Sequence, residues 1–366
     1  MYKGRILTLV DWGESHGCCI GGVLIGLPPG IPVDVDRVNS ELAKRRPGGR
    51  LTSPRQEEDR LEILSGVYRG YTTGAPLAFI IANRDVKGRF YEEVVKYKPR
   101  PGHSDAPARL YSQGFYDYRG GGHYSGRLTA VTVAAGALLE PILESIGVET
   151  TAYLASLGGI PCRVDDWIPR GEVYRSTLYC PDPEASRAMA EALEKARRAG
   201  DSLGGAVEAR ARGVPTGLGN PVHRIDGALA QAVMSIPGVR GVEVGAGVRL
   251  ASMQGSESND PVRVREGQVV SDGPMMGGLL GGHVAGVVRV RATLKPTSTI
   301  GIEQDTVEWR SLEEARIRGW GRHDPAIAIR AVPVVESVLR IVLADYLLEW
   351  TGRMMHYYRL ERGQNK

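Results

Sequence analysis

The sequence predicts an α+β fold. Two segments, 206–212 and 286–294, alternate apolar and polar residues with a period of two. Such alternation is typical of antiparallel strands with one polar or ligand-facing side, and not of a parallel sheet buried on both faces. Helical segments lie between the strand segments, and no composition shift marks a linker anywhere in the 366 residues. One domain that covers the whole chain is therefore expected.

The individual elements follow from local patterns. Further strands are expected at 6–10, 21–26 and 148–157. The segment 36–45 reads as a short helix that turns Val38 and Leu42 inward, and 129–146 as a long apolar helix that ends at Gly147. The clearest helix covers 183–199, because Asp182 can cap its first turn and Gly200 can end it.

A last helix is expected over 332–350. Glu336, Arg340 and Asp345 interrupt its apolar side, which indicates an amphipathic helix and not a membrane span. No uninterrupted apolar run reaches the length of a membrane span, roughly 18 residues. The apolar run at 6–10 is too short for a signal peptide. The expectation is a soluble protein.

Composition favours a small anionic ligand over nucleic acid. The net charge is only +4, and no basic block is present. Arginine is much commoner than lysine, and guanidinium groups bind carboxylates and phosphates in a bidentate manner. Glycine is also frequent, with 48 residues, as in proteins with many tight turns or ligand-binding loops. The four cysteines show no C-x-x-C spacing, so no metal site is expected and a reduced, cytoplasmic compartment fits best.

Several glycine-rich stretches carry polar groups. The stretch 13–17, GESHG, matches the nucleophile elbow of serine hydrolases, with Ser15 as the nucleophile. An elbow should open a helix, and the glycine-broken segment that follows does not favour one. The stretch 119–127, RGGGHYSGR, fits neither the dinucleotide nor the Walker A pattern, yet its backbone N–H groups could face a phosphate.

In their order and spacing these stretches resemble the chorismate synthase family along nearly the whole chain. The matching segments include GESHG at 13–17, RRPG at 45–48, RPGHSD at 100–105, DYRGGG at 117–122, GDSLGG at 200–205, MSIPGVRGVEVG at 234–245, GGLLGG at 277–282, KPTST at 295–299 and GRHDP-x₄-RAVPVVE at 321–336. Chance similarity over so many stretches is implausible.

The resemblance implies a fold in which antiparallel sheets sandwich a helical core, assembled as a homotetramer. It also implies a carbon–oxygen lyase of the shikimate pathway, which serves aromatic amino acid biosynthesis. Members of the family convert 5-enolpyruvylshikimate 3-phosphate to chorismate by a trans-1,4 elimination of phosphate. They require reduced FMN, and NADPH is a possible reductant. A basic, polar tail is expected at about 357–366.

The resemblance also assigns residues. His16 would protonate the departing phosphate, His103 would protonate the flavin near N1, and Asp324 would help to remove the substrate proton, with the Ser15 and Ser125 hydroxyls close by. Substrate clamps would be Arg45, Arg50, Arg100 and Arg127. Contacts to FMN would come from His123, Tyr124, Ser125, Pro237, Gly238, Gly281, Lys295, Pro296, Thr297, Ser298, Thr299 and Arg322. Arg322 would also clamp the substrate.

The chain departs from the family in the loop 123–128. The usual R-S-S-A-R-E-T block reads HYSGRLT at 123–129, so His123 replaces an arginine. Two alternatives therefore stay open. One is a flavin- or anion-binding relative that has lost efficient catalysis, and the other is the serine hydrolase that uses Ser15.

Overall fold

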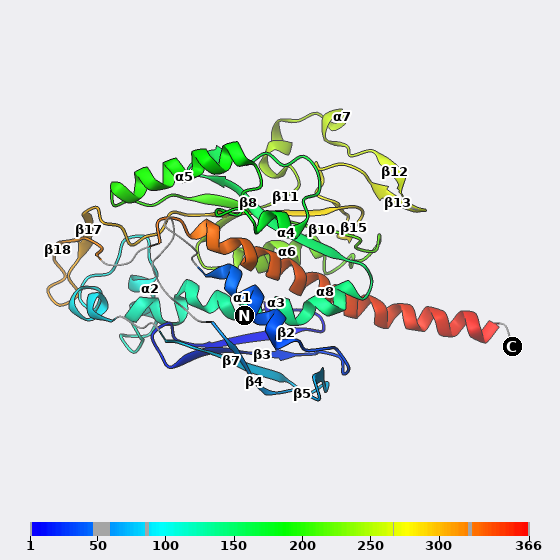
Figure 1. Cartoon of the computed structure of the whole chain (residues 1–366), viewed down its shortest axis with the longest axis horizontal. Helices are drawn as coiled ribbons and strands as arrows, with labels where there is room; N and C mark the ends of the chain where they lie inside the picture. The colour runs from blue at the N-terminus through cyan, green and yellow to red at the C-terminus, as the bar shows by residue number, and fades with distance from the viewer. Residues whose placement is uncertain (1, 47–58, 85–87, 266, 321–323, 365–366) are drawn as a thin grey trace.

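The computed structural model describes residues 2–46, 59–84, 88–265, 267–320 and 324–364. It has three layers, in which a helical layer lies between two antiparallel sheets (Figure 1). The α+β fold class and the helical core between sheets are both confirmed.

The first sheet has the strand order β1-β2-β3-β7-β4, and every neighbouring pair is antiparallel. Its inner face buries Leu9, Ile20, Leu24, Phe79 and Ile81 against the helices. The strands are β1 (Tyr2–Lys3), β2 (Thr8–Gly13), β3 (Cys19–Ile25), β4 (Leu61–Ser65) and β7 (Leu77–Ala82), with the small hairpin β5 (Val67–Tyr68) and β6 (Tyr71–Thr72) beside them. The strands predicted at 6–10 and 21–26 correspond to β2 and β3.

The second sheet has the order β11-β16-β10-β8-β9, again antiparallel throughout. Its strands are β8 (Glu149–Leu157), β9 (Ile160–Pro161), β10 (Gly205–Arg212), β11 (Val239–Val244) and β16 (Val288–Leu294). The alternation in β10 is real, but its polar side does not face water. Arg210 is 3% exposed and donates to the carbonyls of Val164 and Asp166, which belong to a segment that covers the sheet.

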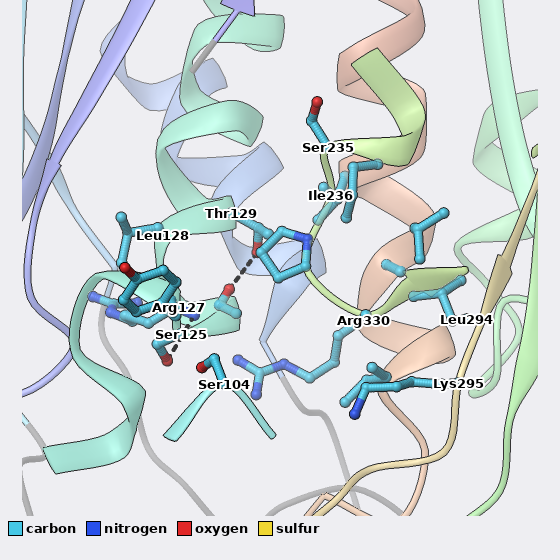
Figure 2. Close-up of a pocket in the computed structure, with 18 of the residues that line it drawn as sticks. Ser104, Ser125, Arg127, Leu128, Thr129, Ser235, Ile236, Leu294, Lys295 and Arg330 are labelled. Carbon is cyan, nitrogen blue, oxygen red and sulfur yellow. Dashed lines mark hydrogen bonds between the residues drawn. The ribbon is translucent and has the colours of Figure 1, made fainter. Parts of the chain in front are cut away.

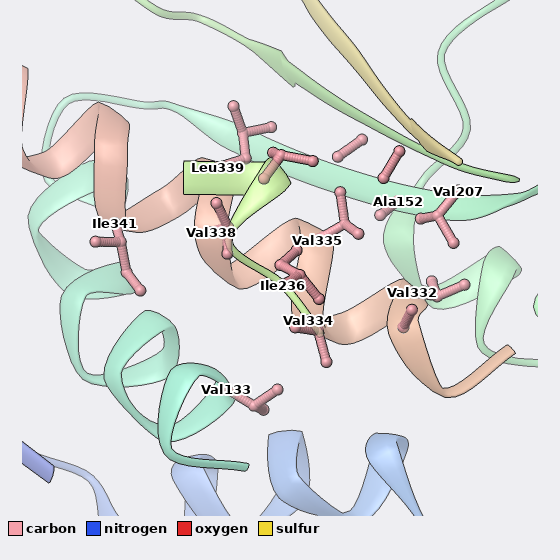
Figure 3. Close-up of a cluster of buried hydrophobic side chains, with 14 of the residues drawn as sticks. Val133, Ala152, Val207, Ile236, Val332, Val334, Val335, Val338, Leu339 and Ile341 are labelled. Carbon is pink, nitrogen blue, oxygen red and sulfur yellow. The ribbon is translucent and has the colours of Figure 1, made fainter. Parts of the chain in front are cut away.

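The helical layer consists of α1 (Val35–Arg45), α3 (Thr129–Glu144), α6 (Ile225–Met234) and α8 (Ile327–Gln364). Val38 and Leu42 of α1 are buried as predicted. Figure 3 shows why α8 is central: Val335 and Leu339 point toward Ala152 and Val207 of the second sheet, whereas Val334 and Ile341 point toward α3.

The polar side of α8 is buried, whereas the polar side of an amphipathic helix at the surface would face solvent. Glu336, Arg340 and Asp345 are each 1% exposed or less. Arg340 pairs with Glu336 at 2.8 Å, and Asp345 accepts three backbone N–H bonds from Arg5, Ile6 and Leu7. The predicted start at 332 was too late, because the helix begins at Ile327 and continues through Pro333. By length and composition Gly126–Glu144 could span a membrane, but 78% of that apolar window is buried inside the fold.

The remaining elements are helix α5 (Pro183–Arg198) and a set of short helices and hairpins. Helix α5 lies outside the second sheet (Figure 1), and Asp182 caps it by accepting from the N–H groups of Glu184 and Ala185, as predicted. The others are η1 (Tyr91–Val95), α2 (Asp105–Tyr111), η2 (Arg119–Tyr124), η3 (Gly126–Leu128), α4 (Arg170–Val173), η4 (Gly247–Ser252) and α7 (Gly255–Ser258), with the hairpins β12 (Val262–Arg265) and β13 (Gln268–Ser271), β14 (Leu279–Leu280) and β15 (His283–Val284), and β17 (Gln304–Val307) and β18 (Glu314–Ile317).

Candidate active site

A cavity of about 870 Å³ lies at one end of the helical layer. Figure 2 shows its two walls: Ser125 and Arg127 to Thr129 stand on the α3 side, and Ser235, Ile236, Leu294 and Lys295 stand on the other. Arg330 of α8 extends between the walls. The α8 residues Val334, Val338 and Ile341 add an apolar strip. The cavity thus combines this apolar strip with a polar part, here called the polar mouth, to which Ser125, Arg127, Lys295 and Arg330 belong.

The polar mouth carries an excess of positive charge. Among the described residues, six basic side chains and two carboxylates line the cavity. The basic residues are Arg45, Arg100, Arg127, Arg240, Lys295 and Arg330, and the acidic ones are Asp11 and Asp324. Two further buried carboxylates, Asp59 and Asp105, pair with the first three arginines. Since six cations face four anions even then, the cavity suits an anionic ligand.

Three glycines in left-handed conformation separate two histidines in this cavity. Gly120, Gly121 and Gly122 have φ values of 61°, 85° and 54°. A Cβ on Gly120 would lie 2.6 Å from Ser15 Oγ and still closer to the His16 ring, and one on Gly121 would lie 2.8 Å from His103 Cε1. Only glycine allows the backbone to pass between both imidazoles at this distance.

His16 follows β2 in the loop that leads to β3, and it is 9% exposed. Its Nδ1 lies 2.9 Å from Ser15 Oγ, and Ser15 Oγ lies 3.2 Å from the Arg119 carbonyl. The consistent assignment has Nδ1–H donating to Ser15, whose hydroxyl donates to Arg119. Tyr91 packs edge-on against the ring at 4.9 Å. His16 is therefore oriented by Ser15 and Tyr91.

His103 is oriented in the same manner. Its Nδ1 lies 2.7 Å from Asp105 Oδ1, and Arg100 donates to both oxygens of that carboxylate. Asp105 can only accept because Arg100 and His103 overcome its burial and hold its pKa well below the usual range, so His103 Nδ1 must carry the proton. Burial lowers the pKa of His103, although Asp105 opposes this shift. His103 is therefore neutral near pH 7.

Arg45 and Arg127 share one buried carboxylate. Asp59, which is fully buried, accepts from Nη1 of both guanidinium groups. Arg45 also donates to Thr129 Oγ1 and to the Gly126 carbonyl, so α1 holds the loop before α3. Both predicted clamps line the cavity, but most of their N–H groups already bind this framework. The two arginines therefore contribute positive charge and rigidity to the cavity wall.

The predicted segment 295–299 forms the opposite wall and lines the cavity with all five residues, Lys295, Pro296, Thr297, Ser298 and Thr299. Lys295 and Ser298 both donate to the Gly102 carbonyl, and Thr299 accepts from Arg100. The Lys295 amide donates to the Gly238 carbonyl, which places Pro237 and Gly238 beside this wall. Burial, and then Arg240 and Arg100, lowers the pKa of Lys295.

His123, Tyr124 and Ser125 continue the α3 side of the cavity. His123 is exposed, and its Nδ1 lies 3.1 Å from the Gly13 carbonyl, so Nδ1–H is the donor there as well. Ser125 Oγ accepts from the Arg127 amide and caps η3.

Asp324 lies just before α8 with its side chain 10% exposed, 3.6 Å from Arg330 Nη1. Its Oδ1 accepts from the Ala326 amide. Two predicted residues, Arg50 and Arg322, lie outside the described residues. Gly281 is in the turn between β14 and β15 and does not line this cavity. No cluster of potential metal ligands occurs among the described residues.

Sequence reasoning missed the residues that orient the predicted ones. Asp59, Asp105, Tyr91 and Arg330 were not proposed as site residues. Asp105 and Arg330 stand inside the matching stretches, so the motifs could have indicated them as site residues. No sequence pattern indicated Asp59 or Tyr91, because only folding brings Asp59 to the arginines and Tyr91 to His16. The hydrolase alternative loses its structural basis, since the loop that carries Ser15 leads into strand β3 and not into a helix.

Comparisons with known proteins all point to one family. Residues 7–348 match the family model described as chorismate synthase. A chorismate synthase of Aeropyrum pernix is 49% identical over 98% of each chain, and one of Korarchaeum cryptofilum is 46% identical over 94% of this chain and 96% of its own. A crystal structure of a chorismate synthase superposes with a TM-score of 0.76 at 28% identity and covers 99% of this chain and 98% of its own.

Proposed function

The chain belongs to the chorismate synthase family, whose members are carbon–oxygen lyases, and we propose that it eliminates phosphate from 5-enolpyruvylshikimate 3-phosphate to give chorismate. In this trans-1,4 elimination the C–O bond to phosphate breaks and one proton leaves the ring. The observation that carries the proposal is the pair of oriented histidines, His16 and His103, which flank one glycine run in a basic cavity.

The charge of the cavity supports a substrate with two carboxylates and a phosphate. Lys295 stands on one side of the cavity, where Arg100 donates to Thr299 of the same wall, and Arg127 stands on the other (Figure 2). Anionic groups at both ends of a small ring can therefore be bound. The buried Asp59 and Asp105 hold the guanidinium planes in place before the substrate arrives, which reduces the entropy lost on binding.

The residues also fit a bound FMN. The apolar strip of α8 suits a flavin ring, and Lys295 suits its phosphate or a ring oxygen. Thr297 Oγ1 is buried and has no hydrogen-bond partner in the described part of the chain, as expected for a hydroxyl that meets a ligand. The volume lies within the usual range for ligand pockets, about 300–1,000 Å³. Reduced FMN, when bound, supplies an electron-rich ring that lends electron density to the elimination and recovers it.

Proton transfer then falls to the chain's own residues. His16 donates a proton to the departing phosphate, and Ser15 holds its ring in the required tautomer. His103 holds a proton on Nδ1 against Asp105 and presents Nε2 toward the glycine run. Asp324 assists removal of the substrate proton, with Arg330 beside it. Ser125 keeps the Arg127 backbone in position.

We further propose that the enzyme works in the cytoplasm as a homotetramer in the shikimate pathway and uses no nucleic acid or membrane partner. NADPH is proposed as one source of electrons for FMN. An anaerobic assay with photoreduced FMN and the enolpyruvyl substrate tests the reaction. Chorismate and phosphate should appear in equal amounts. Phosphate release without chorismate would instead indicate a phosphatase and would refute the proposal.

A further inference from the structure

Two buried cysteines outside the active site meet at the edge of strand β8. The Cys162 amide donates to the Ala155 carbonyl at 2.8 Å, and the Leu154 amide donates to the Tyr179 carbonyl at 2.9 Å. Because Leu154 and Ala155 are consecutive, the segments that carry Cys162 and Cys180 reach the same point of the strand. Cys162 is 8% exposed and Cys180 is 1% exposed.

Both cysteines also lie close to one further residue, Asp182. The Cys180 thiol donates to the Asp182 carbonyl at 3.5 Å, and the Asp182 backbone also acts on the pKa of Cys162. Each of the two thiols shifts the pKa of the other, as neighbouring sulfurs do. Together with the backbone contacts to β8, this places the two side chains next to each other, and both are free thiols in this structure.

We propose that Cys162 and Cys180 form a redox-active dithiol that a small-molecule disulfide oxidises to an intramolecular disulfide. The Cys162 thiolate attacks one sulfur of the small disulfide, and its S–S bond breaks, so a mixed disulfide forms and one small thiol leaves. The Cys180 thiolate then attacks the Cys162 sulfur and releases the second small thiol. The two cysteine protons end on the two small thiols, the cysteines are oxidised and the small disulfide is reduced.

The order of attack follows from the two environments. Cys180 and the Asp182 backbone lower the pKa of Cys162, whereas the Cys162 contact and burial raise the pKa of Cys180. Cys162 is also the less buried of the two, so it is the better first nucleophile. Cys18 and Cys19 are a poorer pair although their sulfurs lie 3.5 Å apart, because a bond between adjacent residues would distort the backbone that enters β3.

The disulfide would close a loop whose side chains hold the helical layer together. Within it, Arg170 pairs with Glu336 of α8 at 2.8 Å, and Tyr174 donates to the same carboxylate at 2.9 Å. Tyr179 donates to the Lys44 carbonyl at 2.7 Å, next to Arg45, which binds the loop before α3. The expected consequence is a more stable fold, without a change in the groups that line the cavity.

The test uses the full chain with Cys18→Ser and Cys19→Ser, so that only the proposed pair remains. The protein is equilibrated with oxidised glutathione, unfolded, alkylated, digested and analysed by mass spectrometry. A linked peptide that contains Cys162 and Cys180 is expected. Closing a loop of this size should also raise the melting temperature by about 5 °C, reversibly with dithiothreitol. Cys162→Ala and Cys180→Ala should each abolish the linked peptide and the shift.

Two outcomes would overturn the proposal. One is complete alkylation of both cysteines after equilibration of the folded protein. The other is a glutathione adduct that persists on Cys162, because Cys180 would then be unable to reach it. If the double serine variant does not fold, the same peptide mapping on the unaltered chain decides the question. No readout depends on catalytic activity, so the result stands apart from the proposed function.

Discussion

Asp105 Oδ1 lies 2.7 Å from Nδ1 of His103, and Arg100 binds both oxygens of the same carboxylate. The charged pair of Arg100 and Asp105 thus supports the His103 ring, which lies beside Gly121 of the glycine run. Because Asp105 is 1% exposed, solvent screens these contacts only weakly. The carboxylate therefore acts on the histidine in two ways, since it fixes the tautomer and opposes the fall in pKa that burial causes.

The first prediction concerns the negative charge of the Asp105 carboxylate. In Asp105→Asn the pKa of His103 should fall further, because burial remains and the attractive partner is lost. If protonated His103 is required, turnover should decline at a lower pH than in the unaltered enzyme as the pH rises. NMR titration of the His103 ring and the pH profile of kcat measure the two shifts. An unchanged profile in a folded variant would show that Asp105 has only a structural role.

The second prediction concerns the proton-transfer residues. His16→Ala, His103→Ala and Asp324→Ala should each lower kcat by about 10²–10⁴, the usual effect of losing a general acid or base. The matched comparison is Arg127→Ala, which removes positive charge from the wall and should weaken substrate binding more. Steady-state kinetics with circular dichroism as a folding check measure this. Near-normal turnover in folded histidine variants would mean that other groups supply the protons.

The third prediction tests the glycine run. In Gly120→Ala the added Cβ meets Ser15 Oγ and the His16 ring, and the residue must also keep a φ of 61°. We expect kcat to fall by about 10²-fold or more because the imidazole is displaced, a typical cost of a misplaced catalytic group. Gly227→Ala is the control, since its Cβ meets nothing within 4 Å on helix α6. An equal kcat in Gly120→Ala and Gly227→Ala would show that the glycine run does not position His16.

The fourth prediction concerns stability and pH. Burial alone would raise the pKa of Glu41, but Arg170, Arg340 and Lys44 outweigh it and lower the pKa to about 2. A depressed carboxylate pKa stabilises the fold above the unfolded value and loses that effect as the pH falls toward 2. Glu41→Gln should therefore cost about 3 kcal/mol at pH 7 and progressively less below pH 5.

Urea unfolding at several pH values measures this difference. Glu194→Gln is the control, because the Glu194 ion pairs with Arg197 and Arg198 lie on the surface and should contribute little at any pH. A loss of stability in Glu41→Gln that does not depend on pH would show that the shape of the side chain matters and its charge does not.

Local patterns predicted elements well where the chain's own chemistry decides them. Asp182 caps α5 through neighbouring amides, and alternation in β10 reflects a pleated strand, so the cap and the strand could both be predicted from the sequence. The burial of the polar side of α8 could not be predicted, because Glu336 and Arg340 look solvent-facing until α1 and α4 supply their partners. For the same reason the motifs predicted His16 and His103, whereas Asp59 became apparent only when folding brought it to Arg45 and Arg127.

The most direct test of the central claim counts turnovers per flavin under anaerobic conditions. The enzyme, substrate and a limiting amount of FMN are mixed with the flavin photoreduced, oxidised or omitted, and chorismate is followed by its absorbance. Many molecules of chorismate per reduced FMN are predicted, with the flavin still reduced at the end and no product in the other two samples. Turnover with oxidised or absent flavin, or one flavin oxidised for each chorismate formed, would contradict the proposed function.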